Sequence, residues 1–241
     1  MKKMKMPKNM GKIIAHVVAI VGVIAVIHAA CSPHHVPSRV MKLGSPKTGQ
    51  CSGIQVHTPA GQDLILSAAH CAGIADAHGS ILITTEDGRQ LKRKIIAEDS
   101  NSDLLLIEGI PGMRGIPVGK MLARGEKVHT DTHGAGHPTY HTEGVIVGDM
   151  QVSVVVAEIT SPEALMACQE HAKNAVVTDG ISLLCLMSVQ ETITTAFMTP
   201  GSSGGAITNT RGELVGICSA GDGKFSFIVR LVDIQKFLSN Y

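Results

Sequence analysis

Two separated segments carry residues that could act together as a base and a nucleophile. Residues 66–71 read Leu-Ser-Ala-Ala-His-Cys and contain His70, and residues 200–205 read Pro-Gly-Ser-Ser-Gly-Gly and contain Ser203. A serine hydroxyl is a weak nucleophile until a neighbouring base removes its proton. The base needs an acid that fixes its tautomer and stabilises its charged form, and Asp103 lies between the two segments. The sequence therefore predicts a triad of His70, Asp103 and Ser203.

The order of these residues and their surroundings resemble the trypsin-like (chymotrypsin-fold) serine proteases. Residues 68–71 are similar to the alanine-alanine-histidine-cysteine element of that family, and 201–205 are similar to its nucleophile loop. Residues 214–221, Leu-Val-Gly-Ile-Cys-Ser-Ala-Gly, resemble its substrate-binding strand. The resemblance covers roughly 49–241. In motif style it is closest to the bacterial Deg-type and glutamyl-endopeptidase-like branches, and the Pro-Gly-x-Ser-Gly-Gly form is closer to the Deg-type proteases than to the digestive trypsins.

Each motif also has a simpler interpretation. A Gly-Ser-Ser-Gly-Gly segment is often a flexible turn, because glycine and serine are common loop residues. A lone histidine after an apolar run is often a packed core residue. Asp99 competes with Asp103 for the acid position, but Asp103 directly precedes an extended apolar run, 104–107, as in the family. The three matches in family order favour the triad.

The resemblance implies roles for further residues. The backbone amides of Gly201 and Ser203 would form an oxyanion hole, and glycine at 201 would permit a backbone shape that a side chain obstructs. Residues Ser219, Ala220 and Gly221 would pair with the backbone of an extended polypeptide substrate.

The specificity pocket departs from the digestive trypsins. Phe197 lies six residues before Ser203, where trypsins carry an acidic pocket floor. The glutamate-specific branch has a histidine at the position of Cys218. We therefore expect Phe197 to be a substrate-binding residue and the preferred substrate side chain to be small or medium and apolar.

The six cysteines are consistent with an oxidising compartment. The resemblance implies disulfides Cys51–Cys71 and Cys168–Cys185, although six cysteines allow 15 pairings. Cys218 lies in an apolar run, where a buried, inert thiol is expected. Cys31 follows small residues, as in a bacterial lipoprotein signal, and is a candidate for lipidation.

The N-terminal segment has the form of an export signal. Residues 1–12 contain five lysines and no acid, and an 18-residue apolar stretch, 13–30, follows. This pattern predicts a signal peptide or a membrane anchor over 1–30, and three fates stay open: lipidation, cleavage without lipidation, and retention. All three place the remainder outside the cytoplasm, in the bacterial cell envelope or periplasm, associated with the membrane or secreted.

The rest of the chain predicts an all-β fold. Short runs rich in Val, Ile, Leu and Thr recur with turn residues between them, which is typical of barrels. We expect a linker over 31–48 and a protease domain over 49–241. The domain would contain two six-stranded antiparallel barrels, at about 49–118 and 119–230. A short intermediate helix would begin at 161–163 and run through 168, and a C-terminal helix would span 231–240.

Four histidines recur every fourth residue at His129, His133, His137 and His141. On a helix this spacing would form a metal-binding face, but the intervening glycines and proline disfavour a helix, and on strands and turns the four would not converge. We therefore expect neither a metal nor a cofactor. A net charge of +1 gives no indication of nucleic-acid binding.

The predicted function is that of an exported serine endopeptidase that acts on polypeptides. The membrane is its other predicted partner, contacted through the N-terminal segment or through a lipid. An idle peptide-binding or adhesion module on the same fold is the main alternative, and an esterase-like hydrolase is a second.

Overall fold

The computed structural model describes residues 39–134, 139–158, 166, 176–178 and 183–241. The predicted signal or anchor segment, Cys31 and all of the predicted intermediate helix except residue 166 lie outside the described residues. Within the described part of the chain, no helix is both long and apolar enough to cross a membrane.

The first half of this part forms a closed antiparallel barrel. Its strands are arranged in the order β1-β4-β5-β6-β3-β2, and pairing of β1 with β2 closes the ring, while the short β7 runs parallel to β2. The strands are β1 (Val40–Ser45), β2 (Gly49–His57), β3 (Asp63–Ser67), β4 (Ser80–Thr84), β5 (Gln90–Asp99), β6 (Leu104–Ile107) and β7 (Ile116–Pro117).

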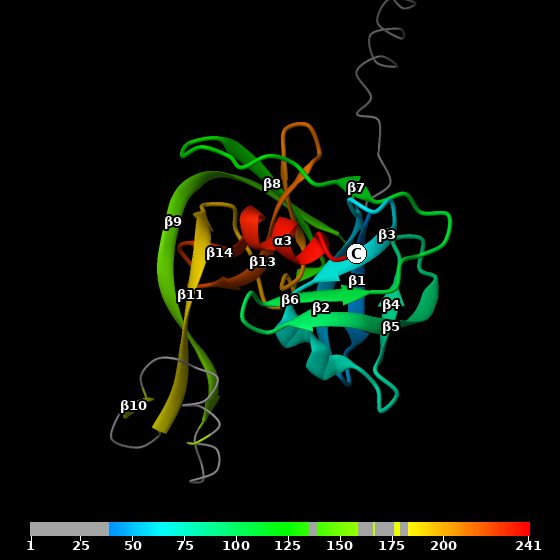
Figure 1. Ribbon diagram of the computed structural model, residues 1–241, viewed down its shortest axis with the longest axis horizontal. Helices are drawn as coiled ribbons and strands as arrows, with labels where there is room; N and C mark the ends of the chain where they lie inside the picture. Colours follow the sequence, from blue (N-terminus) through cyan, green and yellow to red (C-terminus); the bar gives the residue numbers. More distant parts are fainter. Residues whose placement is uncertain (1–38, 135–138, 159–165, 167–175, 179–182) are drawn as a thin grey trace, which may run out of the picture. The chain divides into compact units, whose positions relative to one another are not determined.

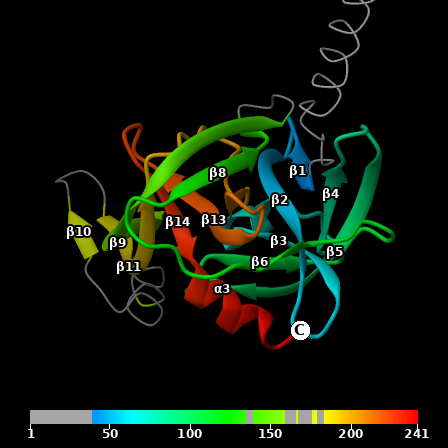
Figure 2. The same cartoon turned by 90° about the horizontal axis from the view of Figure 1, so that it is seen from above.

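The second half forms a second ring beside the first (Figure 1, Figure 2). Its order is β11-β14-β13-β12-β8-β9, pairing of β9 with β11 closes it, and β10 extends the sheet beyond β11. The strands are β8 (Lys127–Thr132), β9 (Tyr140–Glu158), β10 (Val176–Thr178), β11 (Leu183–Thr194), β12 (Ala206–Asn209), β13 (Leu214–Gly221) and β14 (Ser226–Arg230). The predicted two-barrel, all-β fold is confirmed.

One boundary differs from the sequence prediction. Residues 40–45, expected within the linker, form β1 and pair along their whole length with β2. Val40, Met41 and Leu43 of this strand are buried. The neighbouring prolines and basic residues are typical of a linker and led to that prediction, but the first barrel closes only through the pairing of β1 with β2.

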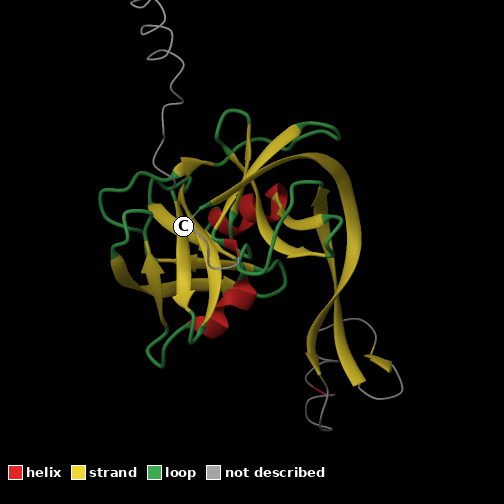
Figure 3. Cartoon of the chain, turned by 180° about the vertical axis from the view of Figure 1, so that it is seen from behind, coloured by secondary structure: helices red, strands yellow, loops and turns green. Residues whose placement is uncertain are grey.

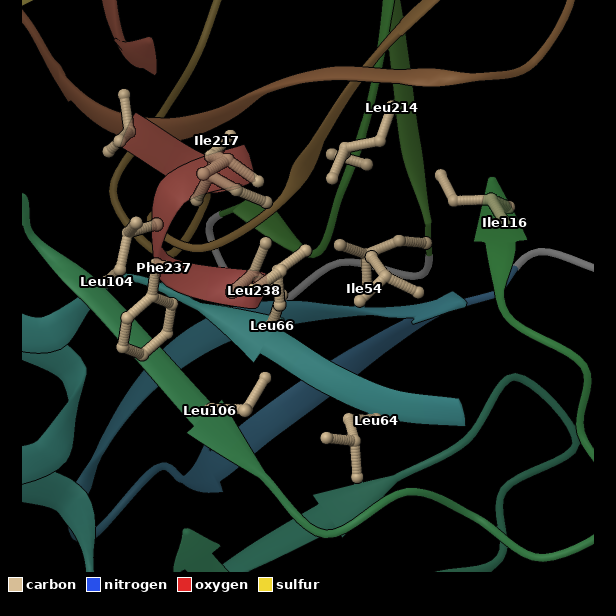
Figure 4. Close-up of a cluster of buried hydrophobic side chains, with 14 of the residues drawn as sticks. Ile54, Leu64, Leu66, Leu104, Leu106, Ile116, Leu214, Ile217, Phe237 and Leu238 are labelled. Atoms are coloured by element: carbon tan, nitrogen blue, oxygen red, sulfur yellow. The ribbon is translucent and has the colours of Figure 1, made fainter. Parts of the chain in front are cut away.

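Three apolar clusters hold the barrels together. One fills the first barrel around Leu43, Ile65 and Ile83, and another fills the second around Val128 and Ile207. The third joins the two barrels to the C-terminal helix α3 (Leu231–Leu238) (Figure 4). It contains Ile54, Leu64, Leu66, Leu104, Leu106, Ile116, Leu214, Ile217, Phe237 and Leu238, among others.

Helices are few in the described part of the chain (Figure 3). The short 3-10 helix η1 (Ala69–Ile74) follows β3, and α3 ends at Leu238, two residues before the predicted boundary. In α3 the buried residues Leu231, Ile234, Phe237 and Leu238 recur at helical spacing, which explains why this helix could be predicted.

The disulfide predicted between Cys51 and Cys71 is present and ties β2 to η1. Cys218 is a buried free thiol, and burial raises its pKa well above the ordinary range, so the expectation of an inert thiol agrees with the structure. Cys168 lies outside the described residues, as does the bond predicted to join it to Cys185.

Candidate active site

The first pair of site residues comes from the first barrel. His70 lies on η1, and Asp103 lies in the turn that joins β5 to β6. His70 Nδ1 is 3.0 Å from each carboxylate oxygen of Asp103, and the backbone amide of His70 donates to Asp103 Oδ1, also at 3.0 Å. The ring and backbone of His70 are thus held by one carboxylate, and Nε2 is the ring nitrogen left for a reacting group.

The competing acid, Asp99, has a different role. Its Oδ1 accepts hydrogen bonds from the backbone amides of Asn101 and Ser102 and so stabilises the turn that carries Asp103. Asp103 has a φ of 52°, the one positive value among the described non-glycine residues. Strained backbone of this kind is concentrated at functional sites, and aspartate tolerates it better than most residues.

Ser219 connects the two barrels at this point. The pairing of β13 with β14 shifts register between Cys218 and Ala220, so Ser219 lies at a β-bulge. A bulge turns a side chain out of the regular alternation of a strand. The Ser219 hydroxyl donates to Asp103 Oδ2 at 2.8 Å, and its carbonyl oxygen accepts from the Ser203 hydroxyl at 3.3 Å.

The loop that carries Ser203 is fixed against the first barrel. The Ser52 amide donates to the carbonyl of Ser203 at 2.7 Å, and the Ser52 hydroxyl donates to the carbonyl of Gly201 at 2.8 Å. Gly204 has a φ of +80°, and a Cβ there would lie 2.1 Å from Ser67 Oγ, so only glycine fits. The serine of one barrel is therefore positioned by β2 and β3 of the other.

The oxyanion-hole amides predicted at Gly201 and Ser203 are available. Gly201 has a φ of 92°, a conformation that favours glycine. Among the described residues neither amide donates a hydrogen bond, whereas those of Ser202, Gly204 and Gly205 all do. Two unused donors beside a serine hydroxyl can stabilise an oxyanion.

The Ser203 side chain is turned toward Ser219. Its hydroxyl bonds to Ser219 rather than to His70, and in the described part of the chain no hydrogen bond joins Ser203 to His70. Hydrogen bonds between such groups are often absent or long before substrate binds.

The electrostatics of the pair favour a charged Asp103 and a basic His70. The hydrogen bond with Asp103 raises the pKa of His70 above its ordinary 6.5, although desolvation opposes the rise. Burial acts to raise the pKa of Asp103, but hydrogen bonds from His70 and Ser219 outweigh it, and the net shift is downward. The ion-pair form of the two residues is thereby stabilised.

A second acid, which sequence reasoning missed, lies next to this pair. Glu191 on β11 is 3% exposed, interacts with the Ser219 hydroxyl, and feels the charges of Asp103 and His70. Burial raises its pKa. The sequence contains a sign of this acid, because Glu191 shares the core-facing alternation of its strand with Val189 and Ile193.

A groove of about 600 Å³ lies beside His70 and Asp103, and neither Ser203 nor Gly201 is among the residues that line it. Of the predicted substrate-binding residues, Ser219 and Ala220 line it, together with His70, Asp103 and Glu191. Gly221 and Phe197 do not line this groove. Phe197 is 48% exposed, and its carbonyl accepts a hydrogen bond from Thr142 at 2.9 Å.

Two groups of side chains in the described residues have a composition that suits a metal. Cys51, His70 and Cys71 lie close together, but the disulfide removes both thiolates as ligands. His129, His141 and Glu143 form the other group. Of the four histidines in the predicted row, strand pairing therefore brings two together, while His133 is buried near Val40 and His137 lies outside the described residues.

Comparison with known proteins assigns the class. Residues 51–217 match the trypsin-like peptidase domain, so the chain belongs to the trypsin-like peptidase family. A search of curated proteins finds no match. Family and fold together support a serine protease.

Solved structures share the fold at low sequence identity. The serine endoprotease from Yersinia pestis is similar with a TM-score of 0.58 and 18% identity, over 85% of this chain and 62% of that one. This chain therefore spans about three-fifths of that protein. The active form of the Rv3671c protease from M. tuberculosis gives a TM-score of 0.60 and 16% identity, over 84% and 80% of the two chains. An inactive form of the Rv3671c protease is similar with a TM-score of 0.58 and 14% identity, over 89% of this chain and 91% of that one.

Proposed function

We propose that this chain is an exported serine endopeptidase that hydrolyses peptide bonds through Ser203, His70 and Asp103. The observation that carries the proposal is a connected set of hydrogen bonds: His70 Nδ1 bonds to the Asp103 carboxylate, the Ser219 hydroxyl donates to the same carboxylate, and the Ser203 hydroxyl donates to the Ser219 carbonyl. It joins a base, an acid and a nucleophile from two barrels, with two unused backbone donors beside the nucleophile.

In the proposed reaction, rotation of the Ser203 side chain moves its hydroxyl from Ser219 to Nε2 of His70. Ser203 Oγ attacks the peptide carbonyl carbon as its proton passes to His70, and the amides of Gly201 and Ser203 bind the resulting oxyanion. The C–N bond then breaks, the leaving amine takes the proton from His70, and an acyl-enzyme remains. His70 then takes a proton from a water molecule as that water attacks the ester carbonyl. His70 passes this proton to Ser203 Oγ as the ester bond breaks and the acid product leaves.

The substrate would lie in the groove, with its backbone along Ser219 and Ala220. Extended peptides commonly add to an exposed strand edge in this way. We retain Phe197 and Gly221 as proposed substrate-binding residues and a small or medium apolar side chain as the preferred one.

We also propose that the domain works outside the cytoplasm. The basic and apolar N-terminal segment supports export, and the Cys51–Cys71 disulfide is of the kind that persists in oxidising compartments. Attachment to the membrane, through the segment itself or through a lipid on Cys31, belongs to the same proposal.

The alternative is an idle peptide-binding module on the same fold, in which the Ser203 hydroxyl would stay bonded to the Ser219 carbonyl and never turn to His70. Hydrolysis of casein by the purified full-length chain and its Ser203→Ala variant separates the two functions. The peptidase proposal expects cleavage by the native chain and none by the variant, with unchanged thermal unfolding. Binding of casein without cleavage by either protein would support the idle module.

A further inference from the structure

The hairpin of β8 and β9 carries a group of polar side chains that the proposed reaction does not use. In the antiparallel register His129 lies opposite Glu143, and Asp131 lies opposite His141. Val128, Thr130 and Thr132 of β8 are buried, so His129 and Asp131 project from the other face of the strand. Directly opposed side chains on one face start from Cβ atoms only about 4.5–5.5 Å apart. Two histidines and two carboxylates therefore share one small area of the outer face.

The distance between His129 and Glu143 suits a shared ion better than a hydrogen bond. His129 Nδ1 is 3.5 Å from Glu143 Oε1, too far for a good N–H···O bond. The same nitrogen is buried and makes no hydrogen bond with any described residue. Two ligands of a tetrahedral zinc ion, each at about 2.0–2.1 Å, are separated by about 3.4 Å. The spacing of these two atoms is close to that edge.

His141 completes the group from the neighbouring position on β9. Its ring stacks on that of His129, with centroids 5.5 Å apart and planes inclined by 20°. One ligand atom from each of His129, His141 and Glu143 can be chosen so that all three lie within 4.8 Å of one another. Small side-chain rotations would bring three such atoms onto one ion.

Asp131 fixes the orientation of the His141 ring. Its Oδ1 lies 2.9 Å from His141 Nδ1. A carboxylate in this place holds the proton on Nδ1 and leaves the Nε2 lone pair for a metal, the arrangement found behind most metal-binding histidines. The hairpin thus offers three ligands and a residue that orients one of them.

We propose that His129, His141 and Glu143 bind one divalent transition-metal ion of the zinc type, with Asp131 orienting His141. Two imidazoles and one carboxylate are donors that zinc commonly takes. The Glu143 side chain is 69% exposed, so a fourth ligand position faces solvent. The ion would link β8 to β9 beside Thr142. The Thr142 hydroxyl donates to the carbonyl of Phe197, which lies in the segment before the nucleophile loop. The ion would therefore stabilise the strand that contacts this segment.

Zinc titration of the purified full-length chain, without a histidine tag and after removal of chelator, tests this proposal by calorimetry. We expect His141→Gln and Glu143→Gln to weaken zinc binding at least tenfold, and Asp131→Asn to weaken it about tenfold to a hundredfold. Both primary substitutions are at exposed side chains, so folding should be retained, as a thermal melt without metal would verify. Zinc should raise the unfolding temperature of the native chain but not that of His141→Gln.

His57→Gln is the matched control. His57 forms a similar histidine–aspartate pair, with Nδ1 2.9 Å from Asp63 Oδ1, but it is not part of either group of candidate metal ligands among the described residues. This variant should bind zinc as the native chain does. Native zinc affinity in both His141→Gln and Glu143→Gln, or no saturable zinc binding by the native chain, would overturn the proposal. Because the readouts are heat and unfolding temperature, they are independent of the proposed peptidase activity.

Discussion

The Ser219 hydroxyl donates a 2.8 Å hydrogen bond to Asp103 Oδ2 across the junction of the two barrels. Asp103 belongs to the first barrel and Ser219 to a bulge in the second, so this bond fixes the acid relative to the strand whose carbonyl holds Ser203. The relative position of base and nucleophile therefore depends on Ser219 as well as on the triad itself.

Ser219→Ala should lower kcat/KM by about tenfold to a hundredfold, because a hydrogen bond to a charged group contributes about 1.5–3 kcal/mol. The backbone carbonyl that accepts from Ser203 remains, so activity should fall without disappearing. Steady-state hydrolysis of a peptide substrate measures the effect. Ser188→Ala, another serine lining the groove, is the control and should keep nearly native kcat/KM. Equal losses in both variants would argue against a special role for Ser219.

The pH dependence of kcat/KM should report the His70–Asp103 pair. The reaction needs neutral His70, and Asp103 raises the pKa of His70 above 6.5, so activity should appear only as pH rises past that elevated value. Asp103→Asn removes the negative charge and replaces one of the two acceptor oxygens beside His70 Nδ1 with an amide NH2 group. Its pH profile should shift to lower pH, and its maximum should fall. A pH profile that does not move in Asp103→Asn would contradict the assignment of the acid.

Glu191 should make stability depend on pH. Burial raises its pKa in the folded state, so the folded protein binds this proton more tightly than the unfolded chain does. That contribution is complete below the unfolded pKa and is lost as pH rises through the folded value. Glu191→Gln keeps a neutral side chain of similar shape, so relative to the native chain it should become more stable as pH rises from 5 to 8.

Urea unfolding at the two pH values measures this difference for Glu191. Glu98→Gln, at an exposed carboxylate on the same groove, is the control and should show no comparable dependence. If Glu191→Gln and Glu98→Gln respond alike to pH, burial does not raise the pKa of Glu191 in the folded protein.

The sequence predicted the elements whose pattern is local. The apolar periods of β2, β3 and β6, the helical spacing in α3, and the motifs around His70 and Ser203 were all readable. What could not be predicted depends on pairing between distant strands. β1 was assigned to a linker because its apolar residues are explained only by its partners β2 and β4.

The candidate sites show the same limit. The proximity of Glu191 to Asp103 depends on the pairing of β11 with β14 and of β14 with β13, which no short motif encodes. The group of His129, His141 and Glu143 depends on the register of β8 with β9, whereas the every-fourth-residue spacing of the histidines concerns neighbours along a single helix.

Labelling by a fluorophosphonate probe, located by mass spectrometry, tests the central claim most directly. The probe reacts readily with an activated serine, so the folded, disulfide-intact native chain should carry the label on Ser203. His70→Ala should lose the label because the base is gone, while Ser202→Ala, at the adjacent serine of the same loop, should still be labelled on Ser203. Absence of label from the folded native chain, or label on Ser203 that persists in His70→Ala, would contradict a nucleophile activated by His70.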